Sequence, residues 1–210
     1  MSLRQIEKPY LDSLESTYKS LQDVYNTAKD YSFDLSKTEI SDAILNRLRT
    51  YYRTQNDIKI FLNKRYIAAA SDFFVESCLF YINLYLEASK SDLKAHSEKQ
   101  LKAKRNSIRP DISIWREDEV VAIIECKTQL GWNRNNWEEE YHRRNKILQV
   151  DFPNAKSFLL VMTGVNWGGF GDHEYINNYF FCLLNEIWPF DYKGEEQIYN
   201  PIERLLSQIK

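Results

Sequence analysis

An uninterrupted apolar run at residues 120–124, Val-Val-Ala-Ile-Ile, constrains the fold of this chain more than any other segment. Such a run predicts a strand that is buried on both faces. It ends in Glu125-Cys126-Lys127, where the strand should emerge at the edge of a sheet. Side chains two residues apart on a strand point the same way. We therefore expect the Glu125 carboxylate and the Lys127 amine to lie side by side, with Cys126 on the other face.

A second carboxylate is predicted to join this pair through a hairpin. Asp111 opens a shorter strand that runs to Trp115, and the polar residues 116–119 turn the chain back into the apolar strand. A turn centred between Glu117 and Asp118 pairs Asp111 with Ile124, within one residue of Glu125. The sequence thus predicts two carboxylates and one lysine at one end of a hairpin.

This set of groups suits metal-assisted hydrolysis of a phosphodiester. Carboxylates are hard oxygen ligands for Mg²⁺, which retains several waters and also takes phosphate oxygens. The metal can make hydroxide from a bound water and offset the charge of the transition state, and a neighbouring lysine adds a positive point charge. A simpler alternative is that Asp111 is a turn residue and that Glu125 and Lys127 form a surface ion pair.

The segment Pro110-Asp111 followed by Glu125-Cys126-Lys127 resembles the P-D-(D/E)-x-K signature of the restriction-endonuclease-like nucleases. The resemblance implies an α/β fold, a restriction-endonuclease-like core with a central mixed sheet flanked by helices. It further implies a Mg²⁺-dependent endonuclease, with Mn²⁺ as a substitute, that cuts double-stranded DNA as a type II restriction enzyme of a restriction-modification system. Asp111 and Glu125 would hold the metal, and Lys127 would stabilise the attacking water or the developing phosphorane charge.

Several points stay open under this resemblance. An acidic residue on the helix before the hairpin often completes the metal shell in the family, and Glu76 is the best match, although a solvated helix face explains it nearly as well. One metal ion or two is undecided. A repair, junction-resolving or RNA-directed nuclease of the same fold is an alternative. So is a nucleic-acid-binding module without turnover.

The formal net charge of −2 gives no global basic field, so any DNA-binding surface must be local. Some basic residues precede the hairpin, and others follow the strand that ends at Lys127. An alternative interpretation of residues 89–107 is a solvated loop. The candidate DNA contacts are Lys102, Lys104, Arg105, Arg109, Gln129, Asn133, Arg134, Arg143 and Arg144. With Lys146, Arg143 and Arg144 should track the DNA backbone while lying too far from the strand's end to touch the scissile phosphate.

The cysteines and the apolar segments indicate a cytoplasmic protein. Cys78, Cys126 and Cys182 lie in apolar sequence without CxxC spacing, as reduced core residues do. The N-terminal residues lack the apolar core of a signal peptide. The most apolar stretch, residues 66–86, contains Asp72 and Glu76 and is therefore not expected to span a membrane.

Residues 1–55 are predicted to form a helical extension and residues 56–210 the nuclease core. A first helix, starting near Pro9, carries a heptad-like apolar stripe that either mediates a homodimer or folds back on the second helix. Ser36 and Glu39 predict a capping box for that second helix, with a break near residues 55–57. Further helices are expected up to residue 87 and at 137–148 and 201–209, strands at 157–162 and 179–184, and a glycine-rich loop at 164–172.

Overall fold

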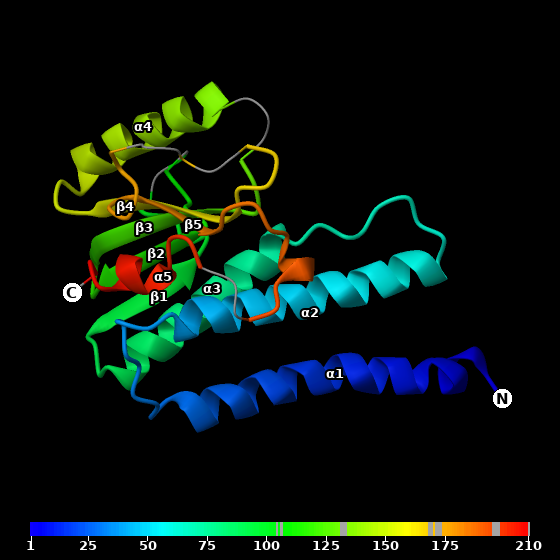
Figure 1. Ribbon diagram of the computed structural model, residues 1–210. Helices are drawn as coiled ribbons and strands as arrows, with labels where there is room; N and C mark the ends of the chain where they lie inside the picture. The colour runs from blue at the N-terminus through cyan, green and yellow to red at the C-terminus, as the bar shows by residue number, and fades with distance from the viewer. Residues whose placement is uncertain are drawn as a thin grey trace.

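The computed structural model describes residues 1–103, 105, 107–130, 134–167, 170, 174–194 and 198–209, without the side chains of 134–136. Its elements are α1 (Leu3–Ala28), α2 (Glu39–Phe61), α3 (Ser71–Ala88), β1 (Leu93–Ser97), β2 (Ile112–Arg116), β3 (Glu119–Lys127), α4 (Arg134–Asp151), β4 (Lys156–Thr163), β5 (Phe180–Leu184), the 3₁₀ turn η1 (Pro189–Asp191) and α5 (Ile202–Leu206). The chain is an α/β protein built on one mixed sheet (Figure 1).

The sheet has five strands in the order β1-β2-β3-β4-β5. The first three form an antiparallel meander, whereas β4 pairs parallel to β3 and β5 parallel to β4. The parallel step from β3 to β4 requires a crossover, and α4 provides it. This topology confirms the predicted α/β class and the mixed sheet, and it makes β3 the strand at which the two modes of pairing meet.

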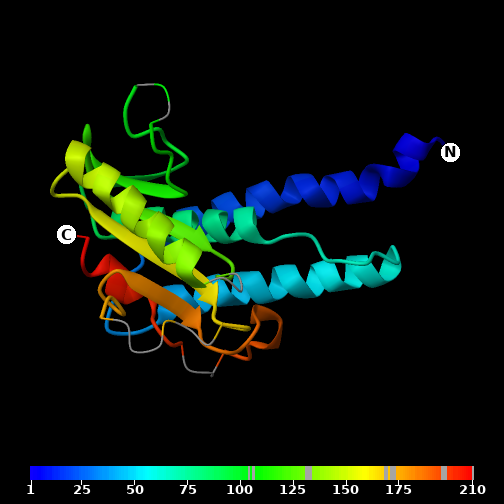
Figure 2. The same ribbon diagram turned by 90° about the horizontal axis from the view of Figure 1, so that it is seen from above.

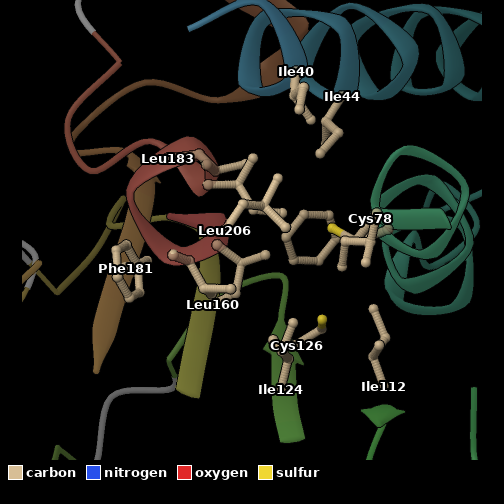
Figure 3. Close-up of a cluster of buried hydrophobic side chains, with 14 of the residues drawn as sticks. Ile40, Ile44, Cys78, Ile112, Ile124, Cys126, Leu160, Phe181, Leu183 and Leu206 are labelled. Atoms are coloured by element: carbon tan, nitrogen blue, oxygen red, sulfur yellow. The ribbon is translucent and has the colours of Figure 1, made fainter. Parts of the chain in front are cut away.

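Helices cover both faces of the sheet. In Figure 1, α4 lies on one side and α2 and α3 lie on the other. The α2 and α3 side holds the main core, to which β3 contributes Ala122, Ile124 and Cys126, and Figure 3 shows these last two residues facing Cys78 and the isoleucines of α2. The alternate residue Ile123 packs towards Leu148 of α4. Burial on both faces is what the apolar run of β3 predicted.

The start of α2 is held by a distant residue instead of the predicted capping box. Thr38 is the N-cap and makes no side-chain hydrogen bond, while Ser36 donates to Asp34. Glu203 of α5, fully buried, accepts from the backbone N–H groups of Ile40 (2.6 Å) and Ser41 (2.9 Å). A carboxylate at a helix N-terminus satisfies N–H groups that lack partners within the helix. This bond fastens the C-terminal helix to the core.

Two boundaries differ from the sequence prediction. The expected break near residues 55–57 does not occur, because α2 continues to Phe61, and the proposed division between residues 55 and 56 falls inside this helix. Residues 93–97 form the edge strand β1, whereas one interpretation of the sequence placed them in a solvated loop. Leu93 and Ala95 face the core in alternation with polar residues, a pattern that is too short to stand out in the sequence.

The helix α1 starts at Leu3, six residues before the predicted start near Pro9. Ser2 and Gln5 form a capping box that adds a turn ahead of the proline. The end of α1 contacts α3, where Tyr25 meets the Phe80 ring edge to face and donates to Glu87. All of α1 is described, and it has no buried residue.

The three cysteines are free and buried, as the sequence predicted. No helix in the described ranges is both long and apolar enough to cross a membrane.

Candidate active site

The β2–β3 hairpin brings Asp111 opposite Glu125. Next to the turn, Arg116 pairs with Glu119, which is the register of a turn centred between Glu117 and Asp118. A bulge between Ile114 and Trp115 then shifts the pairing by one residue, so that Ile112 pairs with Ile124. The predicted pairing of Asp111 with Ile124 is therefore off by one residue, and the shift places Asp111 beside Glu125.

Three charged groups meet where β3 ends. The Lys127 amine lies 4.0 Å from Oδ2 of Asp111 and 3.9 Å from Oε2 of Glu125. The backbone N–H of Cys126 donates to the same Asp111 oxygen at 2.7 Å. The peptide between Glu125 and Lys127 therefore fixes the Asp111 carboxylate. The structure brings together the three residues that the sequence singled out.

The end of β1 fixes the backbone of Asp111. The Ser97 hydroxyl and the Glu98 N–H both donate to the Asp111 carbonyl, at 3.0 Å and 3.3 Å. Asp111 is thus held by β1 through its carbonyl and by β3 through its carboxylate. The interpretation of residues 89–107 as a loop misses this support. The alternation of apolar Leu93 and Ala95 with polar residues was a weak signal for the strand β1.

Glu125 is buried, with 6% of its surface exposed, and its main partner comes from α4. Arg144 forms an ion pair with Oε1 of Glu125. Burial raises the pKa of Glu125 above its ordinary value, while Arg144 opposes that rise, Asp111 adds to it and Lys127 opposes it. The cost of desolvating the carboxylate outweighs the attraction of its two cationic neighbours.

The contact of Arg144 overturns part of the sequence prediction. Arg143, Arg144 and Lys146 were expected to lie too far from the catalytic strand's end to reach the chemistry, and for Arg144 this is wrong. A helix that connects two parallel strands must run back across the sheet, so α4 carries Arg144 over β3 despite a separation of nineteen residues. Arg143, one residue earlier, is exposed and pairs with Glu140 at 2.7 Å.

Asp111 and Lys127 border a cleft of about 570 Å³ between the start of α3 and the end of β3. Its charged lining consists of Asp72, Glu76, Glu98, Asp111 and Lys127. Four carboxylates against one amine make the cleft acidic, so a phosphate could approach only with a cation beside it. Gln129 also lines the cleft, but its amide donates to the Val165 carbonyl and is thereby occupied.

The residues present fit a hard divalent cation of the Mg²⁺ type. Asp111 and Glu125 supply two carboxylates around one point, and Mg²⁺ commonly uses one or two carboxylates with water and phosphate for the rest. Within the described ranges, no three Asp, Glu, His or Cys side chains form a metal cluster. Glu76 therefore lines the same cleft without joining Asp111 and Glu125 as a third ligand in this structure.

The other candidate DNA contacts lie outside this cluster. Lys102 pairs with Asp151 at 2.6 Å, and Arg109 donates to Gln100 at 3.1 Å, so both have partners within the chain. Arg105 is exposed. Lys104 and Asn133 lie outside the described residues, as does the side chain of Arg134.

No protein-family model matches this sequence, and no curated protein matches it either. We therefore infer the function from the geometry of the site and from the motif.

Proposed function

We propose that this chain is a Mg²⁺-dependent endonuclease that hydrolyses phosphodiester bonds in double-stranded DNA, with the type II restriction enzymes as its nearest functional class. The observation that carries the proposal is the placement of the Lys127 amine within 4.0 Å of both the Asp111 and the Glu125 carboxylates, beside an acidic cleft that Asp111 and Lys127 line. A surface ion pair alone would not require Glu125 to be buried or Asp111 to be fixed by two neighbouring strands.

The order of the elements supports the same proposal. A helix, an antiparallel three-stranded meander, a crossover helix and a parallel strand follow one another from α3 to β4. This is the kind of helix-flanked mixed sheet that the P-D-(D/E)-x-K resemblance implies. The motif lies where β3 meets both the antiparallel and the parallel half of the sheet.

Each residue has a distinct role in the proposed reaction. Asp111 and Glu125 would hold the cation, which when bound supplies a water of lowered pKa and offsets negative charge on the phosphate. Lys127, half-exposed to the cleft, donates to the attacking water or to a phosphate oxygen. Arg144 opposes the rise in the pKa of Glu125 that burial causes, and so favours its ionised form. Asp111 is held in place by the Cys126 N–H, so its carboxylate needs little reorganisation.

The test is incubation of the purified chain with mixed phage and plasmid DNA, with and without Mg²⁺. We expect discrete fragments that require the metal. Asp111→Asn, Glu125→Gln and Lys127→Ala should each lower turnover by orders of magnitude, because a lost ligand or transition-state charge costs several kcal/mol and each ~1.4 kcal/mol is tenfold in rate.

Asp118→Asn is the matched control, since it removes a carboxylate from the turn end of the same hairpin. Asp111→Asn should also weaken Mg²⁺ binding, whereas Lys127→Ala should not. Cleavage confined to RNA or to branched DNA would move the chain to the repair, junction-resolving or RNA-directed nucleases. If no nucleic acid is cut in Mg²⁺ or Mn²⁺, the proposed catalysis is wrong.

A further inference from the structure

The N-terminal part of α1 carries an apolar stripe that nothing in the described part of the chain covers. Figures 1 and 2 show this part of the helix projecting away from the sheet. Its large apolar side chains are 42–77% exposed and recur at three- and four-residue spacing. They are Leu3, Ile6, Tyr10, Leu11, Leu14 and Tyr18. Further along, Leu21, Tyr25 and Ala28 continue the stripe and are half-buried, and Tyr25 packs on Phe80 of α3.

We propose that this stripe is a homodimer interface in which α1 of one chain packs antiparallel on α1 of a second copy. The proposal is independent of the proposed nuclease activity, because it uses neither the cleft nor a metal.

The area of the stripe suits a dimer. A large apolar side chain offers on the order of 100–200 Å² when fully exposed. Six such side chains at the observed exposures therefore provide roughly 500 Å² per chain, and a two-fold contact would bury about 1,000 Å² in total. That is the size at which specific interfaces between proteins begin.

Charge selects the antiparallel orientation. Arg4 and Glu15 lie along one flank of the stripe, while Asp12 lies on the opposite side of the helix and pairs with Lys8 of the same helix at 2.8 Å. The other flank carries uncharged residues such as Ser13 and Thr17. Like flanks face each other only in an antiparallel pair. With Tyr10 near the two-fold axis, Arg4 of one chain comes opposite Glu15 of the other.

The charge of α1 also argues against a membrane surface or DNA as the partner of the stripe. Residues 3–28 contain three basic and four acidic side chains. Helices that lie on membranes are rich in lysine and arginine on their polar face, and surfaces that bind DNA need net positive charge. Glu7 is the charged residue that interrupts the stripe, so it limits the strength of the pairing.

The test is sedimentation of the full chain at micromolar concentrations without DNA or metal. We expect a mass about twice the 25.0 kDa of one chain. Leu14→Glu should yield monomers, whereas Ser16→Glu, the same charge on the opposite side of the helix, should leave the dimer intact. Glu7→Leu should strengthen association by tenfold or more, because it replaces a charge within the stripe by an apolar side chain.

Cysteine crosslinking tests the orientation. Tyr10→Cys should crosslink to Tyr10→Cys of the second copy, because position 10 lies near the two-fold axis. Ile6→Cys should crosslink to Leu14→Cys in a mixed sample but not to Ile6→Cys. The native cysteines are buried and should not add crosslinks of their own. Self-crosslinking of Ile6→Cys would overturn the antiparallel arrangement. A wild-type monomer that loses thermal stability on Leu14→Glu would show that the stripe folds onto its own chain, and it would overturn the dimer.

Discussion

Replacing Arg144 by glutamine tests most directly how this site limits the rise in the pKa of a buried carboxylate. Glu125 is buried and its pKa is raised by desolvation, and Arg144 is the strongest of the groups that oppose the rise. Removing the guanidinium should therefore raise the pKa of Glu125 further. Since the ionised form is the one that can bind a cation, the acidic limb of the pH–activity profile should move to higher pH.

The size of the effect follows from the exposure of the two partners. Ion pairs between exposed side chains contribute about 0–1 kcal/mol, whereas breaking a buried pair costs about 3–5 kcal/mol. The Arg144 side chain is 35% exposed, so solvent screening should leave about 1–2 kcal/mol. That energy corresponds to roughly a tenfold tighter hold of Glu125 on its proton, because about 1.4 kcal/mol is one factor of ten.

The direct assay is titration of the Glu125 carboxyl carbon by NMR without metal, with Glu125→Gln to assign the signal. The pH dependence of DNA cleavage in Mg²⁺ gives the second measurement. Arg143→Gln is the matched control, because it removes the same charge from the adjacent, exposed position. An identical titration of Glu125 in the wild type and in Arg144→Gln would refute the role assigned to Arg144.

Three other perturbations test the site, the fold and the DNA path. Glu125→Gln should raise the melting temperature more at pH 8 than at pH 4.5. The raised pKa of Glu125 means that the folded state binds this proton more tightly than the unfolded state does. Stability therefore falls as pH rises through the interval between the unfolded and the folded pKa of Glu125, and a neutral glutamine lacks that loss. An equal change in melting temperature at both pH values would contradict this reasoning. Glu203→Ala should cost about 2–4 kcal/mol in urea unfolding, because two N–H groups of α2 and the Ser41 hydroxyl lose a charged, buried acceptor, and a loss no larger than that of exposed Glu174→Ala would argue against the cap. Arg143→Ser with Lys146→Ser should weaken DNA binding in Ca²⁺ and flatten its salt dependence by about one counterion for each phosphate that is no longer neutralised, while cleavage at saturating DNA is spared; an unchanged salt slope would leave these residues as ordinary helix surface.

The sequence determined the β2–β3 hairpin because every step of that inference is local. A strand has a period of two residues, so Glu125 and Lys127 had to share a face, and a turn near Glu117 had to return Asp111 to the same end. The turn was located correctly. The remaining one-residue shift in register comes from the bulge opposite Ile114 and Trp115, where Val121 has no pairing partner, and no local sequence pattern predicted it.

Only the tertiary structure decided which distant residues support that hairpin. Arg144 reaches Glu125 because the core fixes how α4 lies across the sheet, and the rotation of a crossover helix depends on packing that is absent from its own sequence. The same reason applies to Glu203, which caps a helix 162 residues away, and to β1, whose five residues become a strand by pairing with β2. Short-range periodicity places neighbouring residues, whereas contacts between distant segments follow from the burial of the whole apolar core.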